Sequence, residues 1–124
     1  PPEAMAESTF LASKLDWSEL PRPGHAEIFE LYRRLLAIRR EEVTPRLLGV
    51  GGDAGTYEMF GTAFRVRWTL AEGAVLTLLA NLSDTPADGI EIWKGRRLWL
   101  EGTATGASLG PWSVAWSLSG GGRD

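Results

Sequence analysis

The sequence contains no cysteine and a single histidine, His25. The lack of cysteine excludes a disulfide framework and a thiolate metal site, and a domain of 124 residues needs neither to fold. His25 has no serine or cysteine nucleophile pattern nearby and no second ligand at metal-binding spacing, so we expect it to pack at the start of a helix. We therefore predict no metal and no cofactor.

Long apolar runs and an excess of positive charge are also missing. No run approaches the roughly 20 apolar residues of a membrane span, and residues 1–4 carry neither the basic nor the apolar part of a signal peptide. The net charge of −3 disfavours bare nucleic acid and anionic membranes, because both are bound by basic surfaces. We expect no nucleic-acid partner, no membrane and a cytoplasmic location. Because no initiator Met is present, we expect a fragment or a processed end.

What is present is enough for one folded domain. Hydrophobic residues make up 44% of the chain and charged residues 23%, which argues against disorder throughout. Residues 1–22 hold three of the seven prolines and no steady period, which predicts a surface loop with a helical turn near 9–14. The apolar residues within this loop predict that it docks on something.

Residues 23–41 carry the clearest helical pattern. Pro23 suits a first helical turn, and Arg39 and Arg40 near the end match the helix dipole. Such a wide apolar stripe is a poor partner for a complete β-sandwich, so we expect it to pack on an upstream part of a longer chain. The stripe follows the i, i+3, i+4, i+7 rule and consists of Ile28, Leu31, Tyr32, Leu35 and Ile38.

After a glycine-rich link at 49–55, the hydrophobic period changes to two, which indicates strands. We predict strands at 64–70 and 75–82, a turn at 71–73, and further strands beginning at Ile90 and Ile92 and at 97–100. The expected core-facing residues are Phe64, Val66 and Trp68 in one strand and Trp112, Val114, Trp116 and Leu118 in the last. The pattern predicts a mainly β fold: an antiparallel β-sandwich over 56–119, preceded by one amphipathic helix and an N-terminal loop segment, with a flexible tail at 120–124.

The six tryptophans are the feature with a direct functional interpretation, because flat aromatic rings stack on sugar rings. Trp68, Trp112 and Trp116 share faces with valine and leucine, which favours core packing. The remaining three, Trp17, Trp93 and Trp99, are our candidates for carbohydrate binding. No Asp or Glu has a recognisable catalytic setting, so we predict no catalytic residue in this chain.

Three stretches carry a family resemblance: Phe-Leu-Ala-Ser-Lys-Leu-Asp-Trp-Ser-Glu-Leu at 10–20, His-Ala-Glu-Ile-Phe-Glu-Leu-Tyr-Arg-Arg-Leu-Leu-Ala-Ile-Arg-Arg at 25–40, and Leu-Gly-Pro-Trp-Ser-Val-Ala-Trp-Ser-Leu at 109–118. Together they resemble the C-terminal end of the maltooligosyltrehalose trehalohydrolase family, glycosidases of the α-amylase superfamily. The resemblance covers almost the whole chain. At position 110 it leads us to expect proline or a bulkier residue where Gly110 stands.

The resemblance implies a layout and a function. Residues 1–48 would be the loop and final helix of an otherwise absent (β/α)₈ barrel, and 56–119 the C-terminal β-domain. The parent protein would cleave the α-1,4-glucosidic bond next to the trehalose end of maltooligosyltrehalose, with the catalytic carboxylates in the barrel. This chain would support the barrel, meet α-glucan only through the parent, and not be an enzyme alone. The alternative is a stand-alone carbohydrate-binding or interaction module that uses exposed tryptophan.

Overall fold

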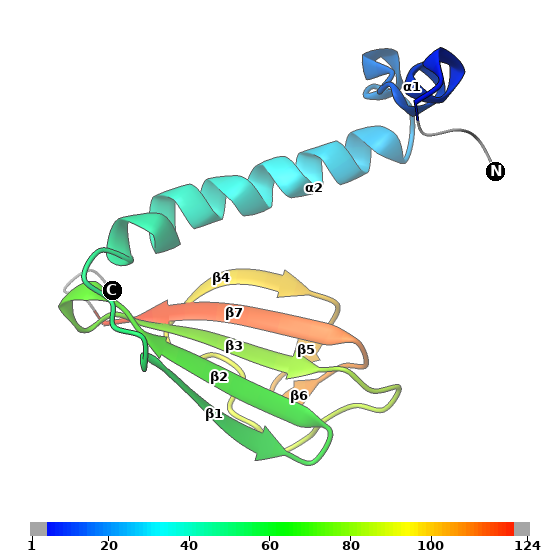
Figure 1. The fold of residues 1–124 in the computed structure, drawn as a ribbon. Coiled ribbons are helices and arrows are strands. Elements are labelled where there is room, and N and C mark those ends of the chain that lie inside the picture. The colour runs from blue at the N-terminus through cyan, green and yellow to red at the C-terminus, as the bar shows by residue number, and fades with distance from the viewer. Residues whose placement is uncertain (1–4, 121–124) are drawn as a thin grey trace. The chain divides into compact units, whose positions relative to one another are not determined.

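A computed structural model describes residues 5–120 of the chain (Figure 1). The chain divides into two compact units, Pro1–Ala37 and Ile38–Asp124, and each is described by itself. Of the predicted tail at 120–124, residues 121–124 lie outside the described residues. No helix in the described part of the chain is long and apolar enough to cross a membrane.

The first unit is helical. It contains α1 (Glu7–Ser13), the 3₁₀ turn η1 (Trp17–Glu19) and most of α2 (His25–Ile38). The helical turn expected near 9–14 is confirmed as α1. Asp16 caps η1, because its carboxylate accepts hydrogen bonds from the Ser18 backbone N–H at 3.0 Å and the Ser18 hydroxyl at 2.6 Å.

Helix α2 begins two residues later than the sequence predicts. Gly24 has a φ of +85°, a left-handed conformation that an α-helix does not contain, so Pro23 cannot open the first turn. The α-helical geometry ends at Ile38, earlier than the predicted residue 41. The chain then continues as the π-helical turn η2 (Arg39–Val43) and the 3₁₀ turn η3 (Thr44–Arg46), both in the second unit.

The second unit is built on a five-stranded antiparallel sheet in the order β1-β2-β3-β7-β4 (Figure 1). A two-stranded sheet, β5-β6, accompanies it. The predicted mainly β, antiparallel fold preceded by a helix is confirmed. The strand bounds are β1 Gly55–Phe60, β2 Ala63–Thr69, β3 Val75–Asn81, β4 Arg96–Glu101, β5 Ala104–Thr105, β6 Ser108–Leu109 and β7 Ser113–Ser119.

The turn at 71–73 is confirmed, and its geometry explains its sequence. Glu72 and Gly73 both have positive φ, at 60° and 75°. This conformation matches the twist of two adjacent antiparallel strands, and here it joins β2 to β3 with the short turn η4 (Ala71–Gly73).

The strand expected at Ile90 and Ile92 is wrong. Residues 88–95 form no strand, yet both isoleucine side chains are buried in the core. Their segment is fixed instead by a side chain of the sheet: the guanidinium of Arg65 on β2 donates a hydrogen bond to the backbone carbonyl of Glu91. Apolar residues two apart can thus be buried by a tethered irregular segment as well as by a strand.

The two faces of the five-stranded sheet differ in what covers them. The register aligns Arg65, Leu79 and Ala115 on one face, which we call the covered face. It forms a core with Ile90, Ile92 and Leu109 from the irregular segment and the small sheet. The opposite face, which we call the open face, aligns Val66, Leu78 and Trp116. Only its end at Leu76 and Leu118 forms a buried cluster, against which Val43 and Val50 pack.

The burial expected for β2 and β7 is therefore largely reversed. The alternation assigns side chains to the right faces, but Phe64, Val66, Trp68, Val114 and Trp116 lie on the open face and are half-buried. Leu118 is buried as expected. On these two strands the covered face carries mostly small side chains, together with Arg65, because the second layer approaches it closely. The residues there that are nearly or fully buried are Ala63, Arg65, Ser113, Ala115 and Ser117.

Candidate functional site

The three tryptophans predicted to bind carbohydrate lie on separate elements. Trp17 is 71% exposed in η1, in the first unit. Trp93 packs on the core of the covered face, and the Arg97 guanidinium lies 4.7 Å from its ring centroid. Trp99 in β4 lies opposite Trp116, and its Nε1 donates to Glu101 Oε2 at 3.3 Å. Trp93 and Trp99 thus belong to opposite faces of the sheet and form no shared surface.

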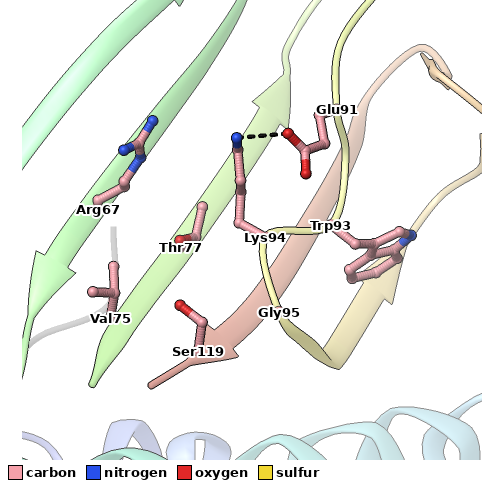
Figure 2. Close-up of a pocket in the computed structure, with 8 residues that line it drawn as sticks. All are labelled: Arg67, Val75, Thr77, Glu91, Trp93, Lys94, Gly95 and Ser119. Carbon is pink, nitrogen blue, oxygen red and sulfur yellow. Dashed lines mark hydrogen bonds and ion pairs between the residues drawn. The ribbon is translucent and has the colours of Figure 1, made fainter. Parts of the chain in front are cut away.

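A shallow hollow of about 360 Å³ lies beside Trp93 (Figure 2). Lys94 Nζ is 2.7 Å from Glu91 Oε2, and this hydrogen bond holds the pKa of the Glu91 carboxyl below its usual range. Figure 2 shows the indole of Trp93 directed away from Lys94 and Thr77. The hollow therefore presents paired charges and hydroxyl groups rather than a flat aromatic face. Its lining residues include Arg67, Thr77, Glu91, Lys94 and Ser119.

Trp112, which the sequence places in the core, is 63% exposed. It precedes β7 and has a φ of +52°, so the alternation of that strand does not extend to it. The signal that identifies this position is the Gly110-Pro111 pair just before it, which is typical of a turn. Trp112 is therefore a further exposed tryptophan that the alternating pattern alone does not reveal.

The predicted helix face is not buried in the described structure. Ile28 and Tyr32 are exposed, and Leu31, Leu35 and Ile38 are only half-buried. No residue of α2 is classed as buried. An amphipathic helix gains most of its stability from packing its apolar stripe, so this stripe is available to a further partner.

The open face of the sheet carries a second apolar surface, which sequence reasoning missed. Tyr57 and Met59 on β1 are exposed, and Tyr57 retains 75% of its accessible area. The register places them beside Val66 and Phe64, which continue to the half-buried Leu78, Val114 and Trp116. A continuous apolar surface of this kind marks an interaction site.

Apart from Glu101, which accepts from Trp99, the carboxylates with resolved interactions are engaged in ion pairs or helix caps. Arg96 contacts both oxygens of Glu42, at 3.0 and 2.6 Å, and this lowers the pKa of the Glu42 carboxyl. Within residues 5–120, no group of three or more His, Asp or Glu could hold a metal ion.

Residues 52–116 match the family described as Domain of unknown function (DUF3459). The match takes in more than half of the chain. The chain belongs to this family. The segment that matches runs from just before β1 into β7, so the family defines the sheet with its covering layer.

Longer proteins show where such a domain occurs. The chain is 37% identical over 83 residues to the malto-oligosyltrehalose trehalohydrolase of Brevibacterium helvolum, and 34% identical over 85 residues to that of Rhizobium sp. (strain M-11). These stretches are 67% and 68% of this chain but 13% of each relative. The Deinococcus radiodurans trehalohydrolase is 51% identical over 41 residues, 33% of this chain and 7% of that protein.

A crystal structure from Salmonella typhimurium, of a protein assigned as an α-amylase, has the same fold with a TM-score of 0.77. It is 26% identical, and the match covers 95% of this chain and 20% of that one. The predicted resemblance is confirmed: the chain is similar to the C-terminal region of an α-amylase-family enzyme.

Proposed function

We propose that this chain is the non-catalytic C-terminal module of a trehalose-releasing glycoside hydrolase, and that it supports the enzyme by covering one side of its (β/α)₈ barrel. The parent would cleave the α-1,4-glucosidic bond next to the trehalose end of maltooligosyltrehalose in the cytoplasm, as part of trehalose biosynthesis. The catalytic carboxylates, and the contact with α-glucan during cleavage, would belong to the barrel. The names of the trehalohydrolase relatives support this choice of reaction.

One observation carries the docking role: on β2 and β7 the large apolar side chains lie on the open face, whereas the covered face of these two strands carries alanine, serine and arginine and is joined by Leu79 of β3. Burial of apolar area contributes roughly 25 cal/mol per Å². A domain that folded for itself alone would gain more by burying Val66, Leu78 and Trp116 than by burying Ala115 and its serine neighbours. Their arrangement favours a partner that completes the open face.

The upstream barrel is the occupant to which the proposal commits. The chain spans only 13% of the two relatives that it matches over most of its own length. Val43 and Val50, on the segment by which the chain enters the sheet, pack on the open-face cluster, so the polypeptide leads into the sheet on this side. A domain joined by this segment would be present at high effective concentration beside the face. The exposed stripe of α2 gives the same partner a second contact.

The experiment compares two exposed positions on one strand. Tyr57 on β1 belongs to the open face, while its neighbour Thr56, also exposed, belongs to the opposite face. Tyr57→Lys and Thr56→Lys would be made both in the 124-residue chain and in the parent enzyme. In the isolated chain, the free energy of unfolding of both variants should stay within about 0.5 kcal/mol of the wild-type value, because surface substitutions usually change it by no more than that.

In the parent enzyme, Tyr57→Lys should lower the thermal midpoint and the half-life of trehalose release, because a lysine would be buried against the barrel. Thr56→Lys should change neither quantity. A parent in which both variants behave like wild type would contradict the docking role. A parent that binds the module but releases no trehalose from maltooligosyltrehalose would contradict the assigned reaction alone.

The alternative, a stand-alone module, is favoured by the exposure of Trp17 and Trp112. Light scattering of the isolated chain with a hydrophobic dye separates the two ideas. Self-association or dye binding supports an uncovered docking face. A monodisperse monomer that binds no dye supports the stand-alone module.

A further inference from the structure

Trp112 combines wide exposure with a strained backbone. A bulky residue at a φ of +52° is an outlier, because its Cβ crowds the backbone in the left-handed region. An exposed indole gains little burial to offset this strain. Residues held in such conformations cluster at functional sites, and Trp112 is therefore a position where the fold gives up stability to present a side chain.

The turn that carries Trp112 is fixed by hydrogen bonds from a buried side chain of the sheet. Asn81, which is fully buried, directs its Nδ2 at three backbone carbonyl oxygens: Thr85 at 2.8 Å, Leu109 at 3.1 Å and Gly110 at 2.9 Å. The Trp112 N–H donates to the Ser83 carbonyl at 3.1 Å. Pro111 adds a fixed φ just before the indole. The ring is thus presented by a preorganised loop pair, which lowers the entropy cost of binding.

The polar groups beside this turn include two hydroxyls, and the exposed Asp84 follows Ser83 in the chain. Ser83 Oγ lies 3.2 Å from Thr62 Oγ1 and 2.8 Å from Asn81 Oδ1. A flat indole beside hydroxyl groups matches a pyranose ring, which has an apolar C–H face and a rim of hydroxyls.

The position of Trp112 separates it from the end of the sheet at which the upstream segment packs. Trp112 precedes Ser113, which pairs with Asn81 at one end of β3 and β7. The Val43 and Val50 contacts lie with Leu76 and Leu118, toward the opposite end of the same two strands. Trp112 therefore lies at the end of the sheet away from Val43 and Val50, although Val114 of the open face is nearby in the chain.

We propose that Trp112 is the platform of a sugar-binding site, which takes one glucopyranose ring of a neutral α-1,4-glucan on its indole. Thr62 and Ser83 supply hydroxyls for the rim of the sugar. The choice of an α-glucan rests on the proposed function, whereas the presence of an aromatic platform does not. The site would hold a distant part of the substrate chain while the barrel works on its end.

The test uses the 124-residue chain and maltoheptaose, with binding followed by heteronuclear NMR of the tryptophan Nε1–H signals. Trp112→Ala should weaken binding by about tenfold or more, which corresponds to ~1.4 kcal/mol. Trp112→Phe should retain part of the affinity, because a smaller ring still stacks. Phe10→Ala, which removes an aromatic ring of similar exposure (66%), is the matched control and should bind as wild type does.

Trp112→Gly separates a binding role from a structural one. Glycine adopts positive φ without strain, so this variant should unfold at the same denaturant concentration as wild type or higher, while losing maltoheptaose binding. A variant that unfolds more easily would make Trp112 a packing residue and overturn the proposal. Absence of a Trp112 signal shift with maltoheptaose would overturn it as well.

Two further outcomes keep this proposal distinct from the proposed function. If the parent releases trehalose but maltoheptaose does not perturb Trp112, the platform is wrong and the enzyme assignment stands. If the parent has no such activity but maltoheptaose binds in a Trp112-dependent way, the platform stands by itself.

If hydroxyl-radical labelling of Trp112 falls when the barrel is present, Trp112 is a docking contact and the sugar site is overturned.

Discussion

Trp68 on β2 and Trp116 on β7 stack on the open face of the sheet, with ring centroids 5.9 Å apart and planes inclined by 12°. Strand β3 lies between their strands, so the two rings reach across Leu76 and Leu78. The stack ties three strands together on the side that lacks a second layer. Rings in this geometry contribute about 0.5–1.5 kcal/mol beyond the area that they bury.

Replacing one ring should therefore destabilise the isolated sheet. Trp116→Ala is expected to lower the free energy of unfolding by about 2 kcal/mol, less than for a fully buried tryptophan because the ring is half exposed. Urea unfolding followed by far-UV circular dichroism measures this. Near-UV dichroism should lose the signal of the coupled indoles. Trp17→Ala serves as control and should leave both unchanged; equal stability of the two variants would argue that the stack contributes nothing.

Gly110 should tolerate no side chain, although the family resemblance leads one to expect a larger residue there. A Cβ at this position would lie 2.0 Å from Thr103 Oγ1 and 3.1 Å from the Thr103 carbonyl oxygen. Gly110→Ala is expected to cost about 1–3 kcal/mol, as overpacking does. Gly51→Ala is the matched control, because a Cβ there meets nothing within 4 Å.

A double-variant cycle identifies the cause of this cost. Thr103→Ala removes the hydroxyl that a Gly110 side chain meets first, so Gly110→Ala should cost less in that background. Chemical denaturation of the four proteins gives the coupling free energy, which should exceed about 0.5 kcal/mol for residues in contact. Additive effects would mean that the turn moves away from Thr103 without resistance.

Local patterns explain which parts of the fold the sequence predicts. The period of 3.6 identifies α2, and the period of two identifies β2, β3 and β7, because both depend on neighbours in the chain. Strand β1 also has the signal, since Tyr57 and Met59 alternate with Thr56 and Glu58. That signal is short and directly follows the glycine-rich link at 49–55, so the first strand is predicted only from residue 64.

The burial of each face could not be predicted in this way. Alternation places Val66 and Arg65 on opposite faces, but it cannot say which face receives the second layer. That layer comes from residues 82–95 and from β5-β6, which are distant in sequence and lack a strong period of their own. The usual assumption, that large apolar residues face inward, holds for a domain alone. It fails here, because Val66 and Trp116 lie half-buried on the open face.

The buried amide of Asn81 gives a prediction with an unusual pH dependence. Asn81→Asp replaces an N–H donor by a carboxylate oxygen that faces three carbonyl oxygens. The expected cost at neutral pH is about 3 kcal/mol, because one buried carboxylate oxygen would face three carbonyl oxygens and only the Ser83 hydroxyl would donate to the other. Protonation restores a donor, so the variant should become more stable relative to wild type as the pH falls toward 4. Ser83→Ala, which removes one hydrogen bond of the same network, should cost only about 1 kcal/mol at every pH.

The ion pair between Glu42 and Arg96 predicts a loss of stability in acid. The two hydrogen bonds from Arg96 lower the pKa of the Glu42 carboxyl in the folded state. A folded-state pKa below that of the unfolded chain means that the stabilisation is complete above about pH 4.3, the value for an unperturbed glutamate, and disappears as the pH falls through the lower folded pKa. Glu42→Gln should therefore cost roughly 1 kcal/mol at neutral pH and progressively less in acid. Urea unfolding of wild type and variant between pH 7 and about pH 3 measures the difference. Glu41→Gln is the control, because the Glu41 carboxylate lies 3.8 Å from Arg40 in a largely exposed pair. A cost of Glu42→Gln that stays constant with pH would contradict the role assigned to the ion pair between Glu42 and Arg96.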